Sequence, residues 1–174
     1  SLDNLGYIKD EAKRKERMDR LASFTRDTMA QLRETIWALN AENISMDQLL
    51  SRIAEFTNHA KNASPQTRFS IENTSENITL TAEQAINLYR TAQEAINNAV
   101  KYADAAHVAI KASGTGVTIQ DDGRGFSREE INEGNGLANM EQRMTGVGFQ
   151  IVIDTAPGKG TRVKILLNGL AQTI

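Results

Sequence analysis

Apolar positions recur at helical spacing through the first forty residues of the chain. From Asp3 to Asn40 there is no proline and a single glycine, and the apolar or small residues that recur every three or four positions are Met18, Leu21, Thr25, Thr28, Leu32, Ile36 and Leu39. This spacing predicts one long helix with a single apolar face. The charged run Lys9–Arg17 fits a solvated face of that helix better than a binding site. A helix of this length cannot bury its apolar face alone, so we expect it to pair with a second helix, from the same protein or another copy.

Two further helices are predicted, each with a capping residue at its start. Ser45 precedes an amphipathic stretch, Met46–Asn62, which ends before Pro65. Thr81 precedes the strongest helical pattern of the chain, Ala82–Ala103. The apolar residues of both stretches recur on one face, which predicts that both helices pack against a common core.

Alternating strands and turn residues fill the rest of the chain. The expected strands are Thr67–Glu72, Ile78–Leu80, His107–Ala112, Val117–Asp121, Gln150–Thr155 and Arg162–Leu167, with a short helix at Leu137–Met144. This order predicts an α+β fold of two layers, in which helices cover one face of a mixed, mostly antiparallel sheet. We expect residues 1–40 to form the separate long helix and residues 41–174 to form the globular domain.

Composition and charge exclude several classes of function. The chain has 174 residues, of which 40% are hydrophobic, enough for one core and an appended element. Its net charge of -2 creates no overall field that would attract nucleic acid or an anionic membrane. It has no cysteine, and no apolar run reaches the roughly 18 residues of a membrane span. We therefore expect a cytoplasmic protein, or the cytoplasmic part of a membrane-anchored receptor.

Three polar side chains share one face of the predicted helix Ala82–Ala103. Glu94, Asn98 and Lys101 are spaced by four and three residues, which places an acid, an amide and a cation on one side within two turns. By itself this trio is also typical of a solvated helix face. Its interpretation therefore depends on the motifs that follow.

Three glycine motifs follow that helix. The segment Asp121–Gly125 ends a strand with a carboxylate and continues with two glycines, which let the chain turn and a ligand approach the backbone. Gly134 and Gly136 lie just before a predicted helix, whose N-terminal amides favour a phosphate. The turn Gly158–Thr161 between the last two strands offers a hydroxyl. Each motif alone is compatible with an ordinary turn or helix cap.

Taken in order, the four motifs resemble the ATP-binding domain shared by DNA gyrase, heat-shock chaperone ATPases, histidine kinases and MutL-type repair proteins, which has the Bergerat fold. The resemblance covers Thr67–Leu167, and the matching segments are Glu94–Tyr102 as the N box, Asp121–Gly125 as the G1 box, Phe126 as the F box, Gly134–Gly136 as the G2 box and Gly158–Thr161 as the final turn. Within this superfamily, Arg33–Asn40 and Gly136–Arg143 are similar to sensor histidine kinases of the nitrate-sensor and related groups. The resemblance implies Mg-ATP as the ligand, a response regulator as a partner and a homodimer formed through helix 3–40.

The resemblance also implies a role for each polar site residue. Asp121 would accept a hydrogen bond from the adenine amine, and Thr161 would add a hydrogen bond nearby. Asn98 would bind Mg²⁺ through its side-chain oxygen, because magnesium takes hard oxygen ligands. Lys101 would present a point charge to the phosphates. Glu94 would polarise the attacking group, either the phosphoacceptor imidazole or a water.

The other residues of the implied nucleotide site provide backbone freedom or further contacts. Gly134 and Gly136 would let a lid close over the phosphates, and Asn97 would contact phosphate or ribose. The implied set is completed by Tyr102, Gly123, Gly125, Phe126 and Leu137. Relatives often carry histidine at the position of Tyr102, a change that leaves the nucleotide pocket intact.

The phosphoacceptor of such a kinase is a histidine followed by an acid, and neither histidine of this chain has that context. His59 is followed by Ala60, and His107 lies in an alternating strand, so we expect both to be structural. We expect the acceptor to lie upstream of Ser1, outside this sequence. The chain should then bind nucleotide without phosphorylating itself.

Three other functions compete with the histidine kinase. An anti-sigma-factor serine kinase has the same motifs but lacks a helix like residues 3–40. A regulatory nucleotide-binding pseudokinase would not need the magnesium and base residues, which are all present. A DNA-dependent ATPase of the gyrase or MutL type needs a following transducer domain, and only seven residues remain after Leu167.

Overall fold

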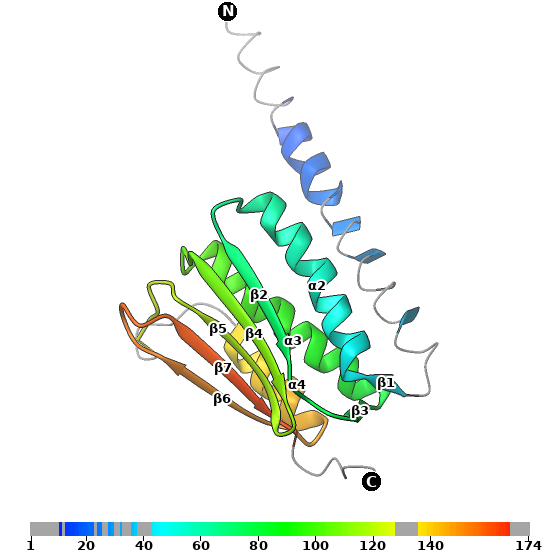
Figure 1. Ribbon diagram of the computed structural model, residues 1–174. Helices are drawn as coiled ribbons and strands as arrows, with labels where there is room; N and C mark the ends of the chain where they lie inside the picture. The colour runs from blue at the N-terminus through cyan, green and yellow to red at the C-terminus, as the bar shows by residue number, and fades with distance from the viewer. Residues whose placement is uncertain are drawn as a thin grey trace, which may run out of the picture. The chain divides into compact units, whose positions relative to one another are not determined.

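The computed structural model describes two parts of the chain (Figure 1). The described residues are 11, 13–22, 24, 25, 28, 29, 32, 36, 37, 43–127 and 136–167. The chain divides into two units, Ser1–Asn40 and Ala41–Ile174. In the first unit the described residues are helical, and the rest of the expected helix 3–40 lies outside them. Its exposed large apolar side chains are Met18, Leu21, Phe24, Met29, Leu32 and Ile36.

Both long helices of the second unit begin with a reciprocal capping box. They are α2, Met46–Ala63, and α3, Ala82–Lys101. Ser45 Oγ accepts the Gln48 N–H at 3.2 Å, while Gln48 Oε1 accepts the Ser45 N–H at 2.9 Å. Thr81 and Gln84 make the same pair of bonds at 3.2 and 3.0 Å. Each box satisfies two main-chain donors, one of them an N–H of the first turn that has no partner inside the helix. The two sequence-predicted capping residues are confirmed.

Five strands form the main sheet, in the order β2-β4-β5-β7-β6. They are β2, Arg68–Asn73; β4, His107–Ser113; β5, Gly116–Asp121; β6, Gln150–Thr155; and β7, Thr161–Leu166. Only the β2–β4 pair is parallel, which agrees with the mixed, mostly antiparallel sheet expected from the sequence. A separate two-stranded ribbon pairs β1, Ile44–Ser45, with β3, Thr79–Leu80, and the sequence did not predict β1.

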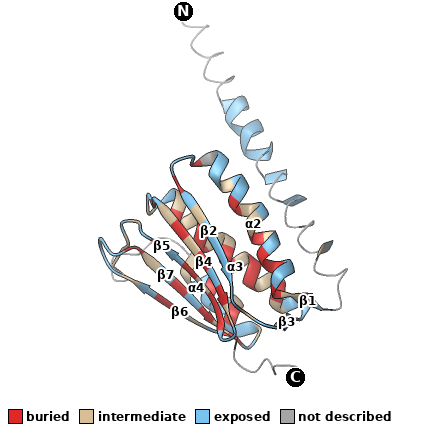
Figure 2. Ribbon diagram, viewed as in Figure 1, coloured by how far each residue is buried: buried red, intermediate tan, exposed pale blue. Residues whose placement is uncertain are grey.

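The core lies between the helices and one face of the main sheet (Figure 2). Its largest fully buried side chains include Leu49, Ile53, Leu88, Ile96, Val108, Ile110, Val117 and Ile165. The short helix α4, Gly136–Gly146, packs beside α3 and buries Met140 and Met144. Because side chains alternate along a strand, Asp121 at the end of β5 lies on the same helix-facing side as Val117 and Ile119.

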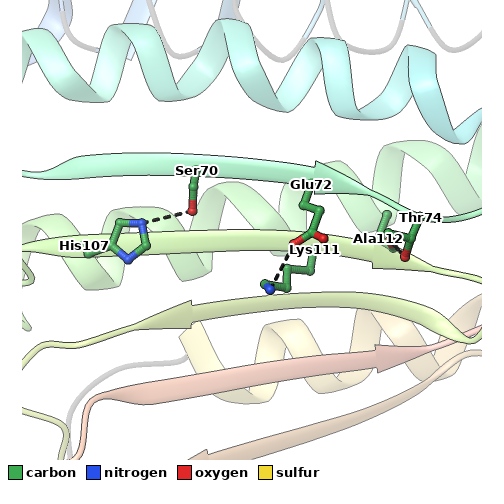
Figure 3. A network of polar contacts seen from close by, with 6 residues as sticks. All are labelled: Ser70, Glu72, Thr74, His107, Lys111 and Ala112. Carbon is green, nitrogen blue, oxygen red and sulfur yellow. Dashed lines mark hydrogen bonds and ion pairs between the residues drawn. The ribbon is translucent and has the colours of Figure 1, made fainter.

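Polar contacts link β2 to β4 on the opposite face of the sheet (Figure 3). Ser70 Oγ lies 3.0 Å from His107 Nε2, and Lys111 Nζ lies 2.9 Å from Glu72 Oε2. The His107 main-chain N–H also donates to Asp122 Oδ1 at 2.8 Å. His107 therefore has structural partners on β2 and in the turn after β5. Among the described residues, no helix combines the length and apolar character that crossing a membrane requires.

Candidate functional site

A cavity of about 390 Å³ opens between α3, α4 and the ends of β5 and β7. Nine of the site residues predicted from the sequence line it: Glu94, Asn98, Tyr102, Asp121, Gly125, Phe126, Gly136, Leu137 and Thr161. They come from all four motifs, which are far apart in the sequence. The fold therefore brings the four motifs together around one space.

Four predicted residues are not among the described lining of the cavity. Asn97 and Lys101 are on α3 but outside the described lining of the cavity, and Lys101 is exposed at the end of the helix. Gly123 supports the site through its backbone, because a Cβ there would lie 2.5 Å from the Ala103 carbonyl oxygen. Gly134 lies outside the described residues.

Six lining residues were not predicted. Five form an apolar wall: Ala95, Ala103, Ile119, Met140 and Val163. Periodicity could have found part of this wall, because Ile119 is two residues from Asp121 on the same strand face and Ala95 is one helical turn from Asn98. The sixth is Arg124, the one cation among the described lining residues. It lies between the two glycines of the Asp121–Gly125 segment, outside any helix or strand whose periodicity could have indicated where its side chain points.

Asp121 is a buried carboxylate with two main-chain donors. It is 6% exposed, and its Oδ1 accepts the N–H groups of Gly123 at 2.9 Å and Thr161 at 3.2 Å. Burial raises the pKa of the Asp121 carboxyl above its ordinary value, while the Gly123 and Thr161 hydrogen bonds oppose that shift and the charge of Asp122 adds to it. Both main-chain hydrogen bonds end on Oδ1, so Oδ2 retains lone pairs for a ligand donor.

The turn between β6 and β7 fits against the end of β5 because glycines lie on both sides of this contact. Gly160 has φ +68°, and a Cβ there would collide with the Asp121 carbonyl oxygen. Gly125 has φ +58°, and its missing Cβ leaves room for the Ala156 carbonyl. The Thr155 hydroxyl joins the two segments, since it accepts the Phe126 N–H at 3.2 Å and donates to the Gly160 carbonyl at 3.1 Å. The second and fourth motifs therefore form one hydrogen-bonded wall of the cavity.

The first and third motifs meet on the other side of the cavity. Glu94 and Asn98 are one turn apart on α3, and both line the cavity. Gly136, the first residue of α4, lies directly against the Glu94 carboxylate. The cavity therefore has an apolar end beside a buried carboxylate and a second end where an acid, an amide and a helix N-terminus meet.

Known proteins share this fold and these motifs. Residues 83–169, half of the 174-residue chain, match the family described as histidine kinase-, DNA gyrase B- and HSP90-like ATPase. The chain belongs to this ATPase family. Its named relatives are sensor histidine kinases, and the domain is the ATP-binding catalytic domain of that class.

Three similar proteins illustrate the relationship. An uncharacterized sensor-like histidine kinase of Chloroflexus aurantiacus is 26% identical over 171 residues, covering 91% of this chain and 29% of that protein. The histidine-protein kinase/phosphatase DegS of Brevibacillus brevis is 40% identical over 85 residues, covering 46% of this chain and 22% of DegS. The ATP-binding domain of PrrB from Mycobacterium tuberculosis superimposes with a TM-score of 0.56 at 26% identity, covering 72% of this chain and 94% of the chain in that domain structure. The chain spans less than a third of the length of the two curated relatives.

Proposed function

We propose that the cavity binds Mg-ATP with the adenine amine on Asp121. The observation that carries this proposal is the buried carboxylate whose main-chain donors both bind Oδ1, because such a group can accept a hydrogen bond from a ligand N–H donor. The apolar side chains of Ile119, Met140 and Val163 suit the faces of a planar base. Thr161 adds a hydroxyl beside the carboxylate.

Magnesium fits the opposite end of the cavity. Asn98 offers a neutral side-chain oxygen there, and Mg²⁺ takes such hard oxygen ligands while keeping phosphates and waters in its other positions. Bound magnesium would neutralise phosphate charge during transfer. Glu94, one turn before Asn98, would accept a proton from the attacking group or orient it.

Several groups would hold the triphosphate. The N-terminus of α4 supplies unpaired amides and a positive dipole end, with Gly134 and Gly136 at its approach. Arg124 adds a cation from the cavity wall, and Lys101 adds one from the end of α3. Asn97 would contact phosphate or ribose. Tyr102, which lines the cavity, completes this group.

The γ-phosphate would pass to a histidine outside this chain and then to a response regulator. Neither histidine of the chain lines the cavity as far as the structure describes it: His59 is exposed on α2, and His107 is bound to Ser70 on the far face of the sheet. The exposed apolar residues of the helix in residues 1–40 support a homodimer formed through that helix. The domain would work in the cytoplasm, where ATP and the response regulator are found.

Calorimetric titration of Mg-ATP tests the proposal with matched pairs of variants. Asp121→Asn should weaken binding about tenfold or more, because the new amide places a donor against the adenine amine. Asp154→Asn, which alters an exposed carboxylate on β6, should bind like the parent. Asn98→Ala should lose the magnesium dependence of binding, whereas Asn87→Ala, about three turns earlier on α3, should keep it. Equal affinity of the parent and Asp121→Asn would refute the adenine assignment.

A further inference from the structure

We infer that Gly136 lets the Glu94 carboxylate rest against the start of α4, so that a side chain at residue 136 would displace that carboxylate and the two positions are coupled. A Cβ built on Gly136 would collide with Glu94 Oε1, and it would lie 3.4 and 3.8 Å from Glu94 Cδ and Cγ. All three nearest atoms belong to this one side chain. The first residue of α4 therefore lies against the proposed base.

Backbone conformation does not explain this glycine. Gly136 is the first residue of α4, and a residue with a side chain could adopt helical backbone geometry there. Gly125 and Gly160 differ, because both have positive φ and a Cβ on either would collide with main-chain carbonyls. At the other end of α4, a Cβ on Gly146 would meet nothing within 4 Å. A Cβ on Gly116 or Gly123 would likewise meet a main-chain carbonyl oxygen first, whereas a Cβ on Gly136 would meet a movable charged side chain.

Charge gives the contact a second role. The first turn of α4 contains no acidic residue of its own, although the unpaired amides at a helix N-terminus favour a negative group. Glu94, which projects from α3, brings a carboxylate to that end. Glu94 therefore brings a negative charge to the start of α4 from a neighbouring helix.

This arrangement places Glu94 and the phosphates at the same helix end, a consequence that rests on the proposed function. In the ligand-free protein Glu94 stabilises the start of α4. When Mg-ATP binds, the triphosphate supplies negative charge to that end, and the carboxylate is released to face the attacking group. Gly136 is then a positioning residue that acts through Glu94, and arrival of the nucleotide prepares the base.

A double-mutant cycle on the ligand-free 174-residue chain tests the steric coupling. Gly136→Ala should change Tm less favourably, by about 2 °C or more, in the parent than in a Glu94→Ala background, because in the parent the new methyl displaces the Glu94 carboxylate from the start of α4. In the Glu94→Ala background the change should be neutral or stabilising, since alanine favours a helix more than glycine does. In a Glu94→Gln background, which keeps the side-chain shape, the less favourable effect should persist. Gly146→Ala is the matched control and should not lower Tm in any background.

Amide hydrogen exchange of α4 tests the role of the Glu94 charge. It is an independent test of the inference if Tm does not change. Glu94→Gln should speed exchange in the first turn of α4 without ligand, and saturating Mg-ATP should restore protection to that of the liganded parent. An equal change in Tm for Gly136→Ala with and without the Glu94 side chain would overturn the inference, as would unchanged exchange in Glu94→Gln. Failure to bind Mg-ATP at all would instead overturn the proposed function, because the ligand-free cycle does not depend on nucleotide.

Discussion

The main-chain N–H of Thr161 donates to Asp121 Oδ1 at 3.2 Å and so ties the turn between β6 and β7 to the end of β5. The same oxygen accepts the Gly123 N–H, which fixes the carboxylate from two sides. Oriented main-chain donors thereby hold an acid in a buried position that disfavours its charge. Removing that charge should therefore affect ligand binding and folding stability in different ways.

Asp121→Asn should weaken Mg-ATP binding but raise the free energy of unfolding. Because burial raises the pKa of Asp121, the native state binds its proton more tightly than the unfolded state does. The protonated Asp121 carboxyl therefore stabilises the folded state, fully so below the ordinary aspartate pKa of about 3.9. This stabilisation is lost as pH rises through the higher pKa that Asp121 has in the native state. The neutral variant keeps an Oδ1 that can accept both N–H groups, so urea unfolding should find it more stable than the parent at pH 7.

The advantage of Asp121→Asn should shrink as pH falls through the raised pKa of the native Asp121 carboxyl toward the ordinary aspartate pKa of about 3.9. Asp154→Asn is the control, since that carboxylate is exposed on β6. Its effect should not follow the same pH dependence. If Asp121→Asn is less stable than the parent at pH 7, the charged carboxylate stabilises the fold, and burial does not disfavour it.

Arg124→Ala should weaken ATP and ADP binding about tenfold and leave adenosine binding unchanged, because the lost cation would pair with phosphate and not with the base. Lys101→Ala provides the comparison, since Lys101 is exposed outside the described lining of the cavity. Calorimetry with the three ligands measures both variants. A larger loss in Lys101→Ala than in Arg124→Ala would show that the helix end, and not the cavity wall, supplies the phosphate charge.

Gly160→Ala should destabilise the protein more than Gly158→Ala. Both residues have positive φ, which costs an alanine about 1 kcal/mol. A Cβ on Gly158 would meet nothing within 4 Å, whereas one on Gly160 would collide with the Asp121 carbonyl oxygen. Urea unfolding of the two variants measures the difference. Equal free energies of unfolding would mean that the turn moves away from β5 without loss.

Thr81→Ala should lower the free energy of unfolding by about 1 kcal/mol, because the first turn of α3 loses the acceptor for the Gln84 N–H. Ser45→Ala should have a similar effect at α2. Ser51→Ala, on the exposed side of α2, serves as the control and should be nearly neutral. Thermal or urea unfolding with unchanged midpoints in both cap variants would contradict the capping role.

The chain alone should form no phosphohistidine. After incubation with γ-labelled ATP and magnesium, acid-labile label should be absent, because His59 and His107 both lie away from the described lining of the cavity. A longer form of the protein that includes an upstream helix is the positive control. Label on His107 would require a different assignment of the acceptor.

Local features of the fold were predictable from the sequence. Ser45 and Thr81 were recognised as capping residues because a capping box involves only residues three apart. The strands β4, β5 and β6 were placed within about a residue of their observed bounds because alternation is also a local signal. The four motifs, read in order, indicated the family because each contains its own glycines and polar groups.

Tertiary structure decided which of those groups meet. The parallel pairing of β2 with β4, the insertion of β7 between β5 and β6, and the two-residue strand β1 depend on partners distant in the sequence. So do the cavity position of Arg124 and the contact between Gly136 and Glu94. The sequence determined where helices and strands begin and which motifs they carry, because those preferences arise within a few residues. Only the packed fold determined how close those motifs come, because contact distances depend on the whole core.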